Sequence, residues 1–359
     1  MRVLYITAHD FTNVSSGSGV RPYAMYLAFV ERGYEVKLLN ANTGRGRRRE
    51  RETAEREIEQ WLKTNRPDFC YIESSTGPIL HNCDYRLIRL LHRMRIPTAY
   101  FYRDYYRKFP DLFPRRKGIV NKLKETYLDW LQFRTDRILR KVNIVYIPSL
   151  EAKYLFPYAD VRELPPAGND CLPVSKDLNR TAIYVGGISE QYGSDVLLDA
   201  FSILNEGNDV YRLICICRAN EFSRFSHCNK NASWLDVYHA AGEELEQYYE
   251  KASVAILPKK GENAYNKLAV SVKLFEYMGH GLPIVATSNL ASDKIITKYH
   301  LGYIADNGAK NLADCIRKMF SDKEKYEQFC CNGREALLSE NLWVHRVDQI
   351  QHDLQEYNS

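Results

Sequence analysis

The chain has 359 residues, of which 45% are hydrophobic and 26% are charged, and its net charge at neutral pH is +5. This size and composition predict two globular domains with substantial cores, and they exclude a disordered or fibrous protein. No apolar run reaches the roughly eighteen residues that a membrane-spanning helix needs, and a strand pattern covers residues 1–6. We therefore expect neither a transmembrane helix nor a signal peptide.

The positive charge is concentrated in the first half of the chain. Residues 1–165 hold 30 Lys and Arg against 19 Asp and Glu, a net of +11, whereas residues 166–359 hold 20 against 26, a net of −6. A basic half indicates an anionic partner such as a lipid surface, a pyrophosphate-linked acceptor or nucleic acid. The nine cysteines are scattered and form no Cys-x-x-Cys pair, which predicts reduced cytoplasmic thiols and no metal site.

Short apolar runs alternate with longer helical patterns along the whole chain, which predicts parallel sheets covered by helices, an α/β fold. In the first half, strands are expected at 3–7, 35–39, 69–73, 98–102 and 143–147, and helices at 22–32, 50–65 and 115–141. The proline pair that begins at Pro165 marks a linker that ends at Asp170. Strands then follow at 181–185, 212–217, 235–239, 254–257, 283–287 and 302–304, and a helix at 342–357.

The predicted helix at 115–141 holds nine Lys and Arg against three acidic residues. Its apolar face would comprise Ile119, Leu123, Tyr127, Trp130, Leu131 and Ile138. A basic amphipathic helix with Trp and Tyr is typical of proteins that lie on an anionic membrane. A helix that packs the same face on a sheet is the alternative, because every helix of an α/β domain must bury one side.

The segment 273–287, KLFEYMGHGLPIVAT, combines an amphipathic helix, a Gly-Leu-Pro turn and a buried strand. Lys273 and Glu276 are three residues apart and therefore share one helix face. A carboxylate in this position can accept two hydrogen bonds from a ribose diol, and a neighbouring lysine can contact a phosphate. An ordinary helix–turn–strand unit, in which Glu276 is only a solvated charge, is the alternative.

This segment resembles the donor-binding signature of GT-B glycosyltransferases, especially the retaining enzymes of family 4, also called glycosyltransferase group 1. The resemblance implies two Rossmann-like domains that face a central cleft. Residues 1–166, joined by the helix 340–359, would bind the acceptor, and residues 167–339 would bind the donor. It also implies that Glu276 binds the ribose, that the reaction retains anomeric configuration, and that it needs neither a metal nor a cofactor. The substrate would be a nucleotide diphosphate sugar, with UDP favoured over GDP.

Glycines after two predicted strands would let the backbone approach a phosphate. The expected donor-binding residues are Glu276, Lys273, Gly186, Gly187, Ser271, Gly17 and Gly19, the last two within the run that begins at Ser16. The chain departs from the family at three positions, where Gly187, Tyr192 and Leu268 replace an Arg, a Lys and a Glu. Other cations must then stabilise the leaving diphosphate. Lys273 and Arg218 are favoured, whereas Lys259 and Lys260 are interpreted as solvated loop charges.

The predicted strand at 98–102 ends in a run of aromatic and charged residues. Asp104 could orient an acceptor hydroxyl, and Arg103 could contact an acceptor phosphate or developing negative charge. The expected acceptor-binding residues are Tyr102, Tyr105, Ser75 and Thr76. An Arg103–Asp104 ion pair with tyrosines at a domain edge is the alternative.

The sequence therefore predicts a cytoplasmic glycosyltransferase of polysaccharide or glycoconjugate biosynthesis, peripheral to the inner membrane surface. Its expected partners are a nucleotide sugar, a glycan or lipid-linked acceptor and an anionic membrane, with a homo- or hetero-oligomer also open and nucleic acid not expected. The alternatives are a non-catalytic subunit that assists a partner glycosyltransferase and a sugar-nucleotide epimerase with the same fold.

Overall fold

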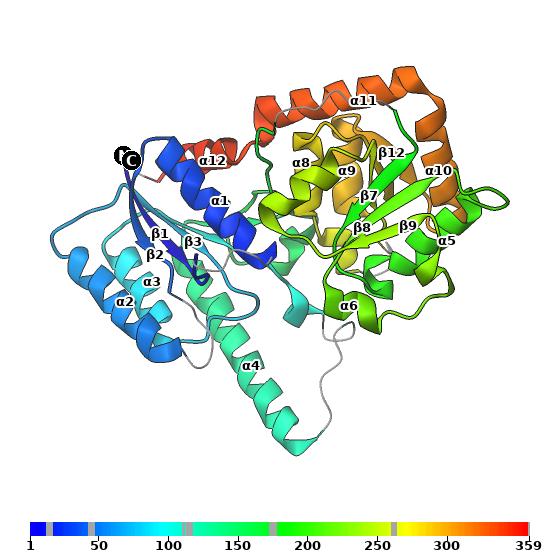
Figure 1. Cartoon of the computed structure of the whole chain (residues 1–359). Helices are drawn as coiled ribbons and strands as arrows, with labels where there is room; N and C mark the ends of the chain where they lie inside the picture. Colours follow the sequence, from blue (N-terminus) through cyan, green and yellow to red (C-terminus); the bar gives the residue numbers. More distant parts are fainter. Residues whose placement is uncertain are drawn as a thin grey trace. The chain divides into compact units, whose positions relative to one another are not determined.

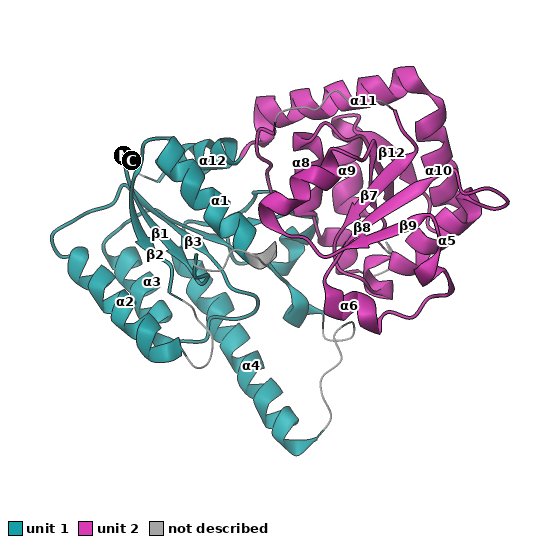
Figure 2. Cartoon of the chain, viewed as in Figure 1, with its two compact units in different colours: residues 1–165, 343–359 teal, residues 166–342 magenta. Residues whose placement is uncertain are grey.

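The computed structural model describes residues 1–11, 17–41, 47–109, 112, 118–171, 178–259 and 264–357. The chain forms two compact units (Figure 2): unit 1 is Met1–Pro165 with Trp343–Ser359, and unit 2 is Pro166–Leu342. Each unit contains one six-stranded sheet covered by helices (Figure 1), which confirms the predicted α/β fold. Within the described residues, no helix is both long and apolar enough to cross a membrane.

Unit 1 is a parallel sheet with the strand order β2-β1-β3-β4-β5-β6. Its strands are β1 (Arg2–Thr7), β2 (Glu35–Leu39), β3 (Phe69–Glu73), β4 (Thr98–Phe101), β5 (Ile144–Ile147) and β6 (Val161–Glu163). Its helices are α1 (Gly17–Glu31), α2 (Arg48–Trp61), α3 (Asn82–Arg93), α4 (Ile119–Ile138) and α12 (Trp343–Gln355). α1 packs against α12, and α2 and α3 pack against each other (Figure 1).

The last helix, α12, is held in unit 1 by side chains of the sheet. Asp353 accepts hydrogen bonds from Tyr146 Oη at 2.6 Å and from Arg162 at 2.9 Å. Arg346 donates from Nε to the carbonyl of Pro165 at 3.0 Å. The chain therefore returns to the first unit after completing the second.

Unit 2 is also a parallel sheet, with the strand order β12-β11-β10-β7-β8-β9. Its strands are β7 (Thr181–Val185), β8 (Arg212–Ile216), β9 (Leu235–Tyr238), β10 (Val254–Leu257), β11 (Ile284–Thr287) and β12 (Gly302–Ala305). Its helices are α5 (Ser194–Leu204), α6 (Ala219–Arg224), α7 (Glu246–Tyr249), α8 (Val272–Gly279), α9 (Leu290–Lys298), α10 (Ala309–Ser321) and α11 (Lys323–Ala336).

Side chains of the central strands of unit 2 alternate between two apolar cores. Ala182 and Tyr184 of β7 pack with residues of α5 and α10 such as Phe201. Ile183 and Val185 point to the other face and pack with residues of α8 and α9. Burial on both faces explains why these strands are continuously apolar in the sequence.

The strands predicted from apolar runs are confirmed, with ends that shift by one residue at most. Strand β6 was not predicted, because it is three residues long and contains Arg162 and Glu163. The predicted start of the first helix at Pro22 is wrong: α1 begins at Gly17, so Gly17 and Gly19 lie in its first turn. Ser16 of that motif lies outside the described residues.

Each sheet contains a point where the direction of strand addition reverses. In unit 1 it lies between β1 and β3, and in unit 2 between β7 and β10. Counted from β7, the order in unit 2 is that of the dinucleotide-binding fold, in which ligands bind outside the carboxyl ends of the strands at this reversal. The fold therefore indicates two candidate binding regions, one at each reversal.

Gly193 brings the loop after β7 against the loop after β10. Its backbone adopts φ +73°, and a Cβ atom there would lie 1.4 Å from the carbonyl oxygen of Pro258. The same residue precedes α5, where its carbonyl accepts a hydrogen bond from the Leu197 amide at 3.0 Å. Only glycine fits this position, because any side chain would displace one loop from the other.

Gly193→Ala is expected to lower the free energy of unfolding by more than about 3 kcal/mol, because it adds a backbone clash to an unfavourable φ. Gly207→Ala is the matched control, since Gly207 has a similar φ of +83° but no atom within 4 Å of the added Cβ. That variant should lose only about 1 kcal/mol. Urea unfolding of both variants measures the difference, and equal losses would contradict a close contact at Gly193.

Candidate functional site

The reversal point of unit 2 is flanked by a glycine turn. β7 ends at Val185 and continues into Gly186 and Gly187. A Cβ on Gly186 would lie 2.6 Å from the Tyr184 hydroxyl, and one on Gly187 would lie 2.6 Å from the ring of Tyr192. A side chain at either position would clash with a tyrosine, so only glycine backbone follows the end of β7.

Glu221 of α6 fixes the same turn. Its Oε2 accepts a hydrogen bond from the Ile188 amide at 3.2 Å, and its Oε1 accepts one from Arg218 at 2.8 Å. Arg218, a predicted catalytic residue, is thus exposed next to the glycine turn and is linked to it through Glu221. The sequence offered no signal for Glu221, because its role depends on α6 folding back toward β7.

Lys259 lies on the other side of the reversal point, two residues after β10 ends. Its ammonium group donates to the carbonyl of Ala269 at 3.3 Å, just before Ser271 and the start of α8. Although the residue as a whole keeps some exposure, burial of the ammonium group lowers its pKa to about 8. The interpretation of Lys259 as a solvated charge is therefore wrong. Lys260 lies outside the described residues.

Glu276 of α8 accepts hydrogen bonds from two side chains, one on α8 and one on α7. Lys273 Nζ and the Tyr249 hydroxyl both donate to Oε2 of Glu276, the latter at 3.0 Å. Within the part of the chain that the structure describes, Oε1 of Glu276 receives no hydrogen bond and the side chain is 24% exposed. Lys273 and Glu276 therefore share a helix face as predicted. The Glu276 carboxylate is oriented by two donors while one oxygen stays available.

Tyr249 of α7 was missed by the sequence analysis. Burial, and then the neighbouring Glu276 carboxylate, raise the pKa of Tyr249 well above its ordinary value, so it remains a hydroxyl donor. Its ring stacks on that of His280, which follows α8, with the ring centroids 4.1 Å apart. No pattern in the sequence links residues 27 positions apart, so only the fold reveals this donor.

Asn266 joins loops on both sides of the site. Its side chain donates to the carbonyl of Gln191 at 3.4 Å, and its own carbonyl accepts from Asn289 at 2.7 Å. Nearby Leu268, which stands where the family has a glutamate, is buried. A residue in this position therefore packs in the core of unit 2 and offers no polar group to a ligand.

The structure brings together three groups of potential metal ligands among the described residues, although the sequence shows no metal-ligand spacing. They are Cys171, Glu246 and His280; Asp199, His227 and Cys228; and Glu55, Cys83 and Asp84. In the last group both carboxylates are bound by Arg51, at 3.0 and 2.7 Å, so an ion pair already occupies them. None of the nine cysteines, all within the described residues, forms a disulfide bond.

The reversal point of unit 1 contains a buried charge cluster. Glu73, at the end of β3, accepts a hydrogen bond from Arg21 at 3.0 Å and from the Tyr71 hydroxyl at 2.7 Å. Arg103 lies 3.8 Å from the other Glu73 oxygen and 3.2 Å from Nε2 of His9. Because arginine can only donate, Nε2 of His9 is the acceptor. Burial, followed by the Arg103 charge, lowers the pKa of His9, which keeps the ring neutral.

Arg103 and Asp104 do not form the simple pair that was the alternative interpretation. Arg103 lies against Glu73, whereas Asp104 accepts a hydrogen bond from the hydroxyl of Thr76 at 2.9 Å. Ser75 lines a cavity of about 40 Å³ at the ends of β1 and β3, with space for two or three water molecules. Ser75, Thr76 and Asp104 therefore follow the carboxyl ends of the neighbouring strands β3 and β4.

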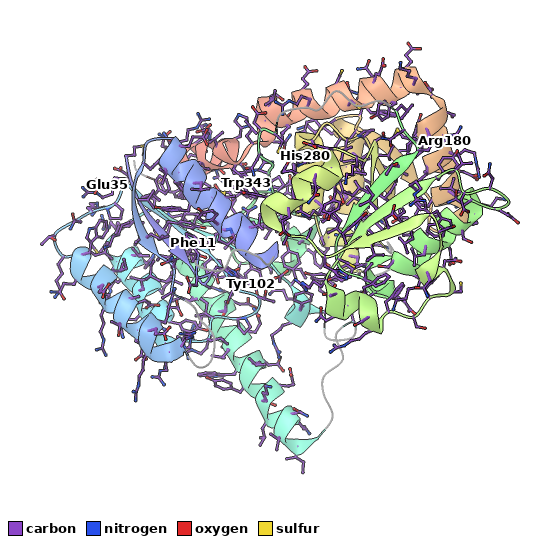
Figure 3. The ribbon with its side chains drawn as sticks, viewed as in Figure 1. Phe11, Glu35, Tyr102, Arg180, His280 and Trp343 are labelled. Atoms are coloured by element: carbon purple, nitrogen blue, oxygen red, sulfur yellow. The ribbon has the colours of Figure 1, made fainter. Side chains whose placement is uncertain are left out.

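The prediction that Tyr102 and Tyr105 bind the acceptor is wrong in this structure, because each is only 2% exposed. Their rings stack on one another with centroids 6.2 Å apart, and Figure 3 labels Tyr102 within unit 1. Phe156 covers both, and the Tyr102 hydroxyl donates to Gln132 at 3.1 Å. The ring faces of both tyrosines are buried in the core of unit 1, so neither ring is accessible to a ligand.

Comparison with known proteins gives a family match for part of unit 2 and a fold match for the whole chain. Residues 179–322 match the family model described as Glycosyl transferases group 1. No curated protein sequence matches the chain. Among solved structures, the chain is similar to a sucrose-phosphate synthase from Thermosynechococcus elongatus, with 14% identity over 99% of each chain and a TM-score of 0.69.

Two further solved structures have the same architecture. WaaG, a glycosyltransferase involved in lipopolysaccharide biosynthesis, is 14% identical over 98% of this chain and 99% of its own, with a TM-score of 0.65. HepE from Anabaena, in complex with UDP, is 12% identical over 99% of this chain and 100% of its own, with a TM-score of 0.63. The expected GT-B fold is confirmed, whereas assignment to the retaining family 4 remains a prediction.

The lowered pKa of Lys259 can be tested directly. In the protein with ¹³C-dimethylated lysines, one resonance should titrate near pH 8 and should be absent from Lys259→Met. Lys310→Met, at an exposed lysine, is the control and should keep the resonance that titrates near pH 8. If the signal lost in Lys259→Met titrates above pH 10, Lys259 is solvated after all.

Proposed function

We propose that this chain, which has the GT-B glycosyltransferase fold and carries the Glycosyl transferases group 1 domain, transfers a sugar from a nucleotide diphosphate sugar to an acceptor hydroxyl. The observation that carries the proposal is the placement of Glu276 on α8 and of Lys259 against Ala269, just before α8 begins. Glu276 would offer a carboxylate oxygen to a ribose diol. Lys259 would offer a desolvated ammonium group to the diphosphate.

The donor would lie outside the carboxyl ends of β7 and β10. A diphosphate there meets the backbone of Gly186 and Gly187, the N-terminus of α8 after Ser271, and the Lys259 ammonium group. Amide groups at a helix start and a nearby cation are the ordinary means of binding phosphate. Lys273 is already bound to Glu276, so its expected role changes from phosphate contact to orientation of that carboxylate.

A UDP-sugar is the proposed donor. Two of the similar solved structures, HepE and an α-glucosyltransferase, contain UDP, which supports this choice. In the reaction, the bond between the sugar C1 and the β-phosphate oxygen breaks and a bond from C1 to the acceptor oxygen forms. The acceptor proton passes to the departing UDP, whose negative charge Lys259 stabilises. We propose that the configuration at C1 is retained and that no metal is needed.

The acceptor would bind to unit 1, where the reversal point gathers His9, Asp104, Ser75 and Thr76. These neutral and acidic groups suit sugar hydroxyls, and the Arg103 guanidinium next to them suits a phosphate. These side chains, together with the net charge of +11 over residues 1–165, favour a glycan or a lipid-linked glycan as the acceptor. Nine cysteines without a disulfide bond fit a reducing compartment such as the cytoplasm.

One observation favours a non-catalytic subunit as the second candidate. The ring of Tyr192 fills the space beside Gly187, so the family arginine could not stand at position 187 without displacing it. The two departures from the family are therefore linked, and both remove a cation. A chain that binds the donor but transfers nothing would fit this arrangement.

Glu276→Gln is expected to weaken UDP binding about 10- to 100-fold, because an amide accepts the ribose hydrogen bonds less strongly than a carboxylate. Isothermal calorimetry with UDP and GDP, with and without magnesium, measures the change and the preferred base. Glu335→Gln, an exposed site on α11, is the matched control and should bind normally. Equal affinities in the two variants would remove Glu276 from the donor site.

The affinity for UDP should also depend on pH. As the pH rises above about 8, Lys259 loses its proton and its charge, so binding should weaken by up to about tenfold per pH unit. Lys259→Met should bind weakly at pH 7 and should not weaken further on going to pH 9. The Lys310→Met control should keep the dependence of the original chain. A dependence that persists in Lys259→Met would assign the titration to another group.

A further inference from the structure

The outer half of α4 is an apolar face that the rest of unit 1 leaves uncovered. The exposed fractions of six large side chains lie between 50% and 82%: Ile119, Val120, Leu123, Tyr127, Trp130 and Phe133. The buried residues of the helix begin only at Leu131. Figure 1 shows the N-terminal end of α4 extending away from the sheet of unit 1. The interpretation of the whole apolar stripe as a packed face is therefore wrong for this half.

The cations of α4 border its exposed apolar residues. Lys122 and Lys124 flank the apolar residues, and Arg137 continues the row formed by Leu123 and Trp130 at intervals of seven residues. The Arg134 guanidinium lies 4.6 Å from the centre of the Trp130 ring. The exposed apolar surface is thus bordered by positive charge along its length.

The acidic residues of α4 are turned toward Arg107 and Lys108 of unit 1. Arg107 contacts Glu125 at 2.9 Å and Asp129 at 2.5 Å. Lys108 contacts Asp136 at 3.1 Å. These two cations hold all three carboxylates of the helix, and its outward face combines apolar groups with cations.

We propose that the outer half of α4 binds the surface of an anionic lipid bilayer. The apolar side chains would enter the region of the headgroups, where Trp and Tyr are favoured, and the lysines and arginines would contact lipid phosphates. The rings of Tyr127 and Trp130 stack on each other, with centroids 5.8 Å apart, and form one continuous aromatic surface.

A second copy of the chain fits this face less well. A symmetric contact through α4 would bring the two sets of cations together, and like charges in contact oppose association. An anionic bilayer meets the apolar and the cationic groups at once, so charge complementarity selects it.

The test is co-sedimentation of the full chain with phosphatidylcholine vesicles that contain or lack phosphatidylserine. The original chain should bind the anionic vesicles in preference to the neutral ones, and added salt should weaken binding. The variant Lys122→Glu, Lys124→Glu, Arg137→Glu should lose about 100-fold in affinity or more. Ile119→Ser with Leu123→Ser and Trp130→Ser should also lose binding, although it keeps every charge.

The matched control reverses three exposed lysines of unit 2: Lys310→Glu, Lys323→Glu and Lys325→Glu. It changes the net charge equally and should keep vesicle binding. Loss of binding in the control, or unchanged binding in the α4 variants, overturns the proposal. A dimer in sedimentation velocity that the α4 variants dissociate, without vesicle binding by the original chain, would assign the face to a second copy. The assay needs no nucleotide, so its outcome is separate from that of the proposed transfer.

Discussion

The close approach of Gly193 to Pro258 is the contact on which the second unit's site depends. At this point the strand order reverses, and the loops after β7 and β10 meet. The contact sets the distance between the Gly186–Gly187 turn that follows β7 and Lys259, which offers a charge. Asn266 then ties the same region to the start of α9. A nucleotide site built in this way would owe its shape to backbone packing.

Glu276 and Lys259 have complementary electrostatic roles. Glu276 is partly buried, and its charge is balanced by Lys273 and by a tyrosine that remains protonated at any ordinary pH. Lys259 has no carboxylate partner among its described contacts, and burial leaves it weakly basic. An anion that enters between them would restore the missing charge balance at Lys259. This explains how the site could manage without the two family cations replaced by Gly187 and Tyr192.

The sequence predicts the fold well because its information is local. Buried parallel strands require continuous apolar runs, and those runs locate every strand except the short, charged β6. The helix that carries Lys273 and Glu276 was predicted for the same reason. The contacts that failed to be predicted are long-range: the donor Tyr249, the turn anchor Glu221 and the desolvation of Lys259 all depend on packing between distant segments. Tyr102 and Tyr105 were predicted to bind a ligand but are buried. An aromatic run at a strand end can complete a core as easily as it can face a ligand.

The crystal structure of the chain with UDP would test the account most directly. The account predicts ribose hydroxyls within hydrogen-bond distance of the Glu276 carboxylate, with the diphosphate between the Gly186–Gly187 turn, the first turn of α8 and the Lys259 ammonium group. A UDP molecule bound away from Glu276, or a diphosphate that makes no contact with these three elements, would contradict it.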